Sequence, residues 1–214
     1  MTDHLLDVHG ELLAPESIRM LKYLKARAAE LSIAQIRERI RAAAQELENA
    51  VAAVDAVDAR RCPVEGKWNI AEVVDHISQT QIRGTEELRH LLAGRRPPLP
   101  PVYEGIQSGA GKWLPWQMLV EELHAADQAM IALFDGVSEE PYPSLTVKTL
   151  VVTLRTSADG DTAAQLYFAE LEFKEYALLQ RLHLLDHRTQ IKKLRASLAA
   201  SAKPEGNRDT PRVG

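Results

Sequence analysis

The chain has 214 residues, of which 45% are apolar and 5% aromatic, and its formal net charge is -4. This length suits one domain with a sizeable core, and the weak negative charge argues against nucleic-acid binding. No apolar run approaches the ~18 residues that cross a bilayer, so we expect no membrane span. Plentiful Ala and Leu favour an all-α fold.

Two further features bear on location. Residues 1–4 lack the charged-then-apolar layout of a signal peptide, and the single Cys62 cannot form an internal disulfide. We therefore expect a cytoplasmic protein. Cys62 directly precedes Pro63, and we interpret it as an incidental thiol rather than a nucleophile.

The first predicted helix covers about residues 17–57. Apolar residues recur there at spacings of three, four and seven, which is typical of an amphipathic helix with a break near Ser32. These residues are Ile18, Leu21, Leu24, Ala28, Leu31, Ile36, Ile40, Leu47, Val51 and Val54.

A second helix is predicted over residues 70–93, after a loop at 60–67. Asn69 can cap it and Glu72 can complete a capping box, while Trp68 stands where an apolar staple is common. The expected apolar stripe consists of Ile70, Val73, Ile77, Leu88 and Leu91. His76 lies at the edge of that stripe, beside Thr80, Arg83 and Glu87.

Residues 95–115 form a long loop rich in Pro and Gly. A rigid connector explains its Pro run better than a polyproline ligand for an SH3-like partner. A third helix is predicted over residues 116–135, ending at Gly136.

The β-branched run at 145–154 predicts either a short strand or an irregular crossover. A turn follows at 157–161, and a fourth helix is expected from about Thr162 to residue 200. One domain therefore covers residues 1–200, and residues 201–214 form a disordered polar tail.

His183 and His187 stand four residues apart on that last helix. Their side chains are separated by about 40° around the axis and about 6 Å along it, so both can reach one ion. The surrounding stripe, formed with Tyr176, Leu179, Gln190 and Leu194, is apolar at both ends. The residues by themselves allow either a metal site between helices or two histidines hydrogen-bonded at the edge of the core.

The segment Trp68-Asn69-Ile70-x-Glu72-Val73-Val74-x-His76, together with His183-Leu-Leu-Asp-His187-Arg-Thr-Gln190-Ile191, resembles the DinB/YfiT-like family of bacterial metal-binding four-helix bundles. The resemblance covers about residues 18–198. It implies that His76, His183 and His187 bind one divalent ion.

Three neutral imidazoles leave a coordination position open, as in catalytic zinc, nickel or iron sites. Family members include S-transferases that use low-molecular-weight bacterial thiols and a mycothiol-dependent isomerase. The resemblance thus implies a metal-dependent thiol S-transferase or hydrolase that acts on a small molecule. Two alternatives stay open: a non-catalytic interaction module and a purely structural metal site.

This chain departs from the family pattern in an extra N-terminal segment, a longer loop after the second helix and an insertion at 145–161. We expect these segments to line or cover the mouth of the pocket. Asp186 could orient His183 or could simply be solvated. The remaining histidines are expected elsewhere: His124 exposed or capping, His90 too far along its helix, and His4 and His9 at the surface.

A second apolar row on the last helix consists of Leu171, Leu178, Leu182 and Leu185. A helix that is apolar on two faces is either central in its bundle or packs against another subunit. From this row we expect a homodimer.

Overall fold

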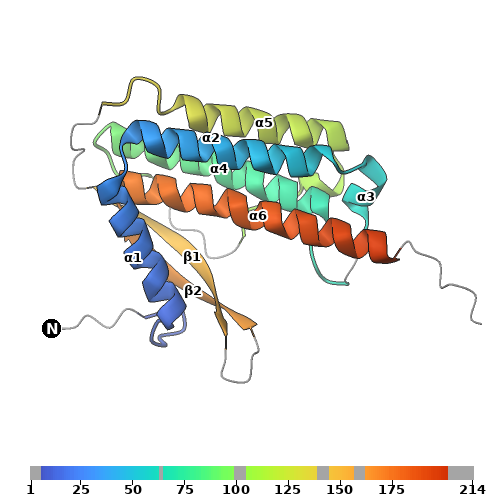
Figure 1. Cartoon of the computed structure of the whole chain (residues 1–214), viewed down its shortest axis with the longest axis horizontal. Helices are drawn as coiled ribbons and strands as arrows, with labels where there is room; N and C mark the ends of the chain where they lie inside the picture. Colours follow the sequence, from blue (N-terminus) through green and yellow to red (C-terminus); the bar gives the residue numbers. More distant parts are fainter. Residues whose placement is uncertain (1–5, 63–64, 99–104, 139–144, 157–161, 202–214) are drawn as a thin grey trace, which may run out of the picture.

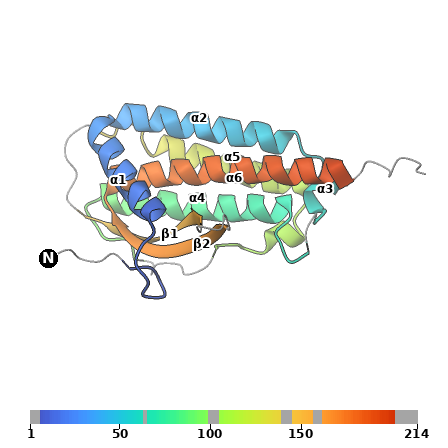
Figure 2. The same ribbon diagram turned by 60° about the horizontal axis from the view of Figure 1, so that its bottom comes forward.

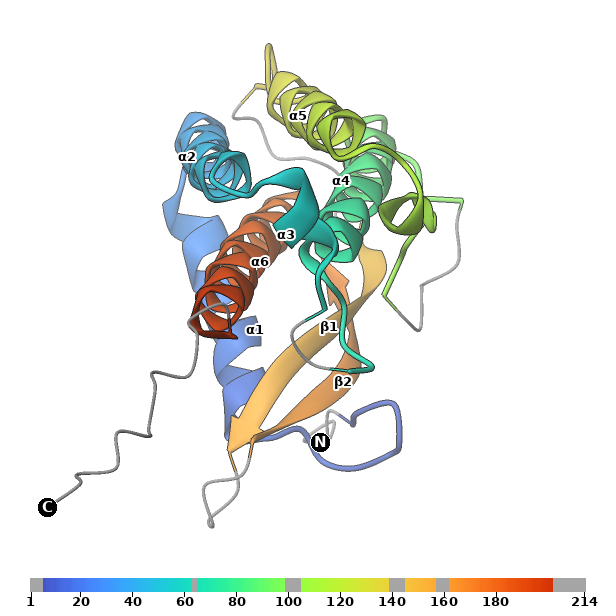
Figure 3. The ribbon, with the colours of Figure 1, turned by 90° about the vertical axis from the view of Figure 1, so that its right-hand side faces the viewer.

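The structure is a computed structural model, and it describes residues 6–62, 65–98, 105–138, 145–156 and 162–201. Its long helices are α2 (Ile33–Ala52), α4 (Ile70–Leu92), α5 (Trp116–Ala132) and α6 (Phe173–Ser201). They lie side by side in Figure 1, and the view along them in Figure 3 shows the four corners of a bundle. The predicted four-helix bundle is confirmed.

The remaining helical segments are α1 (Pro15–Glu30), α3 (Ala56–Arg60) and the 3-10 turn η1 (Ala110–Lys112). The predicted break near Ser32 is confirmed. Ser32 accepts a hydrogen bond from the Gln35 amide at 3.1 Å, and the Gln35 side chain accepts one from the Ser32 amide at 2.9 Å. This capping box starts α2 afresh, so α1 leaves the bundle direction and crosses beside the strands (Figure 2).

The two strands β1 (Val147–Thr156) and β2 (Thr162–Leu171) form an antiparallel hairpin, with Val151 opposite Tyr167. The strand interpretation of 145–154 is therefore confirmed, and the fold is helical with one small sheet. The predicted start of the last helix near Thr162 is wrong, because α6 begins at Phe173. Alternate residues of β2 are buried, namely Gln165, Tyr167, Ala169 and Leu171. This period of two outweighs the helix propensity of its alanines.

The apolar stripe predicted on α4 forms part of one continuous core, since all five of its side chains are at most 2% exposed. The second apolar row of the last helix is also occupied from within the chain. Leu171 belongs to β2, Leu178 is buried, and α6 packs on α1, α2 and α4. The packing of α6 on three other helices accounts for its two apolar faces, so the homodimer stays a prediction without support from this row.

Within the described residues, none of the helices combines the length and apolarity that a membrane crossing requires. The predicted turn at 157–161 and the predicted tail beyond residue 201 lie outside the described residues.

Candidate metal centre

His76 is placed by the start of α4. Asn69 accepts a hydrogen bond from the Glu72 amide at 2.9 Å, and Glu72 accepts one from the Asn69 amide at 3.0 Å, so the predicted capping box is confirmed. The box fixes the first turn of α4. His76 then follows two turns into the helix, on the side that faces α6.

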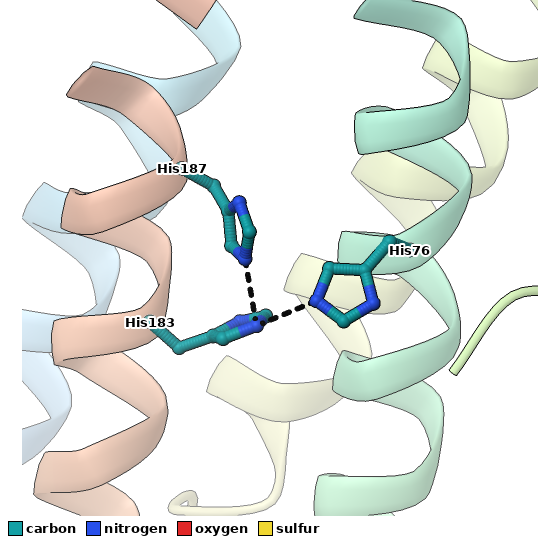
Figure 4. A group of neighbouring side chains, drawn as sticks. All are labelled: His76, His183 and His187. Atoms are coloured by element: carbon teal, nitrogen blue, oxygen red, sulfur yellow. Dashed lines mark hydrogen bonds between the residues drawn. The ribbon is translucent and has the colours of Figure 1, made fainter. Parts of the chain in front are cut away.

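The three predicted histidines come together (Figure 4). The Nε2 atom of His183 lies 3.1 Å from Nε2 of His76 and 3.0 Å from Nε2 of His187. All three candidate ligand atoms lie within 4.8 Å of one another. The pair on α6 is thus completed by one histidine from α4, more than a hundred residues away in sequence.

The hydrogen bonds of the Nδ1 atoms determine which ring nitrogens carry a lone pair that can bind a metal ion. His76 Nδ1 lies 2.7 Å from the carbonyl oxygen of Ile106, and His187 Nδ1 lies 2.7 Å from Oε1 of Gln190. Because both partners are acceptors, each Nδ1 carries the proton and each Nε2 presents a lone pair. Both lone pairs point at His183 Nε2, which can supply at most one proton. A cation at this point relieves the remaining repulsion.

The three imidazoles are held in their neutral form. Burial lowers the pKa of His76, and burial followed by the neighbouring His76 lowers the pKa of His187 to about 4. Burial and its two histidine neighbours lower the pKa of His183 well below its ordinary value. Neutral imidazole is the form that binds metals, so the site needs little deprotonation near neutral pH.

The donor set fits a divalent cation. Three nitrogens at 2.0–2.1 Å from a tetrahedral ion are about 3.3 Å apart; two of the three separations, 3.0 and 3.1 Å, are close to this value, and all three are within 4.8 Å. Nδ1 of His183 is buried without a hydrogen-bond partner among the described residues. Asp186 therefore does not orient His183; its side chain is exposed.

The cluster opens into a cleft of about 1030 Å³. The cleft is bounded by α4 and α6, and by three segments that the sequence predicted at the pocket mouth. The N-terminal part contributes Glu16, the loop after α4 contributes Gly105 and Ile106, and the insertion contributes residues 148–154. The expectation that these segments line the pocket is confirmed.

The loop after α4 is tied to the helix one residue before His76. The buried carboxylate of Asp75 accepts hydrogen bonds from Ser108 Oγ at 2.7 Å and from the Gly109 amide at 3.0 Å. Gly111 lies so close to α4 that an added Cβ would be 2.8 Å from the Glu72 Cα. Sequence reasoning missed this anchor, although an Asp beside a predicted ligand was a signal for it.

The other histidines lie away from the cluster. His124 is exposed and lies 2.8 Å from Glu48, as expected for a surface residue. His90 lies 3.3 Å from Glu86 on its own helix, and His9 is exposed. His4 is outside the described residues. Cys62 is exposed and does not line the cleft.

A bundle of four helices with three histidines converging from two of them is the arrangement of a metal-binding helical protein. A sequence model of the DinB superfamily matches residues 39–191, more than two thirds of the chain. The chain belongs to the DinB superfamily. The family resemblance inferred from the motifs around His76 and His183 is confirmed.

Three solved structures share the fold. YfiT from Bacillus subtilis, described as a probable metal-dependent hydrolase with an unusual four-helix bundle topology, is 11% identical with a TM-score of 0.53, covering 78% of this chain and 87% of its own. A mutant of a mycothiol-dependent maleylpyruvate isomerase is 14% identical with a TM-score of 0.56, covering 81% and 70%. A conserved protein from Enterococcus faecalis is 15% identical with a TM-score of 0.51, covering 77% and 95%. No curated protein matches the sequence.

Proposed function

We propose that this protein binds one divalent metal ion through His76, His183 and His187 and uses it in a reaction on a small molecule. The observation that carries the proposal is the convergence of three neutral imidazole nitrogens on one point in the wall of a cleft. Membership of the DinB superfamily supports it, as does the fold shared with a probable metal-dependent hydrolase.

The bound ion would supply Lewis acidity that lowers the pKa of a water or a thiol into the physiological range. The chain's own residues hold the ligands. The Ile106 carbonyl fixes the His76 ring, and the Gln190 amide oxygen fixes the His187 ring. The Trp68 ring lies tilted against the His76 ring, with the ring centroids 5.0 Å apart.

Two reaction classes use this arrangement: hydrolysis, and transfer of a low-molecular-weight thiol. In both, three protein ligands leave room for the reacting oxygen or sulfur. Because Cys62 lies outside the cleft, a reacting thiol must come from a cosubstrate. Zinc, nickel and iron all accept imidazole ligands, and the donor set does not choose among them.

The deciding experiment is elemental analysis of protein purified without a polyhistidine tag. We expect about one divalent ion per chain in the wild type. His183→Ala should lower the affinity more than about 100-fold, since losing a ligand costs more than losing a ligand's hydrogen-bond partner. The matched control His124→Ala removes an exposed histidine and should keep the metal. A wild type that holds no divalent ion even after reconstitution contradicts the proposal.

Two measurements separate the alternatives. If the ion were purely structural, chelation would unfold the bundle, whereas a bundle preformed without the ion would stay folded and lose only the stability that ion binding adds. Titration of cobalt-loaded protein with N-acetylcysteine tests the thiol reaction. A thiolate-to-cobalt absorption band supports S-transfer, and its absence favours hydrolysis.

A further inference from the structure

The cleft is longer than a metal-bound reacting group requires. Along α4 it extends from His76 to Glu87, eleven residues or about 16 Å of helix. Its volume of about 1030 Å³ lies at the upper end of the range of ~300–1,000 Å³ for small-molecule sites. The part of the cleft beyond the histidines therefore has room for the rest of an elongated substrate.

One side of this long cleft is the edge of a strand. Seven consecutive residues of β1, 148–154, line the cleft, with side chains from both faces of the hairpin. No residue of β2 lines it, within the strand residues that the structure describes. Among the described residues β1 pairs with β2 alone, so its other edge has no strand beside it there, and residues along β1 border the cleft.

A free edge presents hydrogen-bonding groups of the backbone. In an antiparallel pair, alternate residues direct their N–H and C=O groups toward the partner strand, and the residues between them direct theirs outward. Among the described residues, no backbone group outside the hairpin is bonded to this edge of β1. The cleft thus contains a row of alternating donors and acceptors.

A buried acceptor on α6 belongs to the wall of the cleft. The Gln180 side chain is 4% exposed and lines the cleft, and its Oε1 has no hydrogen-bond partner among the described residues. Gly84 makes room for it, since an added Cβ there would be 2.8 Å from Gln180 Cδ. A buried amide oxygen without a donor is costly, so the Gln180 side chain would gain a hydrogen bond by turning its Oε1 toward a ligand N–H or O–H in the cleft.

The neighbouring polar groups of this part of the cleft are engaged with each other. Tyr176 donates its hydroxyl hydrogen to Glu87 Oε2, and Arg83 Nε donates to Glu87 Oε1 at 2.9 Å. The charge of Glu87 is thereby balanced within the wall. The unmet requirement there is for a neutral donor facing Gln180.

We propose that the free edge of β1 and Gln180 form a second subsite, which binds an extended amide-bearing chain of the substrate. The chain, a short peptide or a peptide-like small molecule, pairs with β1 as a third strand and directs its reacting end toward the histidines. Extended chains rise about 3.4 Å per residue, so about four or five amide units fit along 16 Å. Only the reacting end rests on the proposed metal function.

An amide chain fits better than other occupants of the same length. A hydrocarbon chain would cover the outward N–H and C=O groups of β1 without bonding them, which costs free energy for each buried group. An amide chain repeats donors and acceptors at the spacing of the strand and also offers an N–H to Gln180.

The test uses N-acetyl-Ala-Val-Ala-Val-amide as the probe and the same peptide with methylated amide nitrogens as its control. Both are titrated into the full-length wild type and into His187→Ala while backbone amide exchange is followed by NMR. We expect saturable binding that protects every second amide of residues 147–156. The methylated peptide should bind at least about tenfold more weakly, since each lost hydrogen bond costs ~1 kcal/mol.

A side-chain variant tests the second half of the subsite. Gln180→Met keeps the length of the side chain and removes the acceptor, so probe binding should weaken about threefold to tenfold. Gln117→Met, at an exposed position on α5, should leave it unchanged.

Equal binding of the two peptides, or exchange protection without alternation along β1, would overturn the subsite. Failure to bind the probe at millimolar concentration would do the same. The His187→Ala arm separates this proposal from the metal proposal. Probe binding that persists there supports the strand edge whether or not the wild type holds an ion. A wild type that holds an ion but shows no alternating protection rejects the strand edge alone.

Discussion

The four-helix bundle and the α1–hairpin unit, formed by α1, β1 and β2, differ in how completely their buried polar side chains are hydrogen-bonded. In the α1–hairpin unit, the buried Ser17, Thr153 and Gln165 hydrogen-bond to one another. Among the described residues, every buried side-chain nitrogen or oxygen that lacks a partner lies on a bundle helix, α2, α4, α5 or α6.

This difference indicates where ligands bind. A fully paired network gives rigidity, whereas an unpaired buried group costs stability until something binds it. Gln180 Oε1 is such a group, on a residue that lines the cleft. The α1–hairpin unit then supplies a firm wall, and the bundle supplies the proposed metal ligands and an unpaired acceptor that a substrate could satisfy.

The largest effect is expected from Asp127, buried between α5 and α4 and bonded to Gln81 at 2.8 Å. Burial above all, with a contribution from the nearby Glu48, raises its pKa from 3.8 to about 7, and the hydrogen bond from Gln81 and the nearby His124 oppose part of that rise. The folded state therefore holds the proton more tightly than the unfolded state. Stability from this group is present below about pH 4 and is lost as the pH rises through about 7, by up to about 4 kcal/mol.

Asp127→Asn keeps the acceptor for Gln81 and cannot ionise. We expect this variant to be more stable than the wild type at pH 8, measured by urea unfolding. Its unfolding free energy should fall much less between pH 5 and pH 8 than that of the wild type. The exposed Glu121 on the same helix provides the control, Glu121→Gln. If the unfolding free energies of the wild type and Asp127→Asn changed equally with pH, Asp127 would not be a buried group whose ionisation destabilises the bundle, and this contrast between the two regions would be lost.

A smaller effect is expected from Gln190, whose Oε1 accepts a hydrogen bond from His187 Nδ1–H. Gln190→Leu leaves that N–H without its acceptor and frees the ring to rotate. Divalent-ion affinity should fall about 10- to 100-fold in a chelator competition assay. Gln117→Leu, at an exposed position on α5 that does not line the cleft, is the control. Unchanged affinity would mean that Gln190 does not hold the ligand.

The smallest effect is expected from Gln165→Leu in the α1–hairpin unit. Gln165 Oε1 accepts hydrogen bonds from the Ala14 amide and the Ser17 hydroxyl, both at 2.8 Å. Removing it leaves buried donors unpaired, so unfolding free energy should fall by about 1–2 kcal/mol. Metal affinity should stay within twofold. If Gln165→Leu also weakened metal binding, the two regions would be coupled, which would contradict the separation between the α1–hairpin unit and the bundle.

Helical features were predictable because they depend on neighbours in sequence. The Asn69–Glu72 box and the His183–His187 spacing follow from one helix each. That His76 meets this pair was implied by the family resemblance rather than by spacing. Periodicity cannot establish such a contact across a hundred residues.

The hairpin was only half predicted, since a strand is defined by its partner. Residues 163–169 were predicted to be helical, as their alanines favour. Which of these side chains are buried is evident only once β2 is paired with β1. The free edge of β1 and the anchor at Asp75 were missed for the same reason. Both depend on segments that meet only in the folded chain.

The contact between Ile106 and His76 has a thermodynamic consequence. One carbonyl both positions the ring and belongs to the loop that borders the cleft, so a shift of that carbonyl would also change the aim of His76 Nε2. If the histidines bind an ion, a molecule that displaces residues 105–106 would weaken ion binding by the same factor by which the ion weakens the binding of that molecule. Occupancy of the cleft and occupancy of the proposed metal site would then be linked.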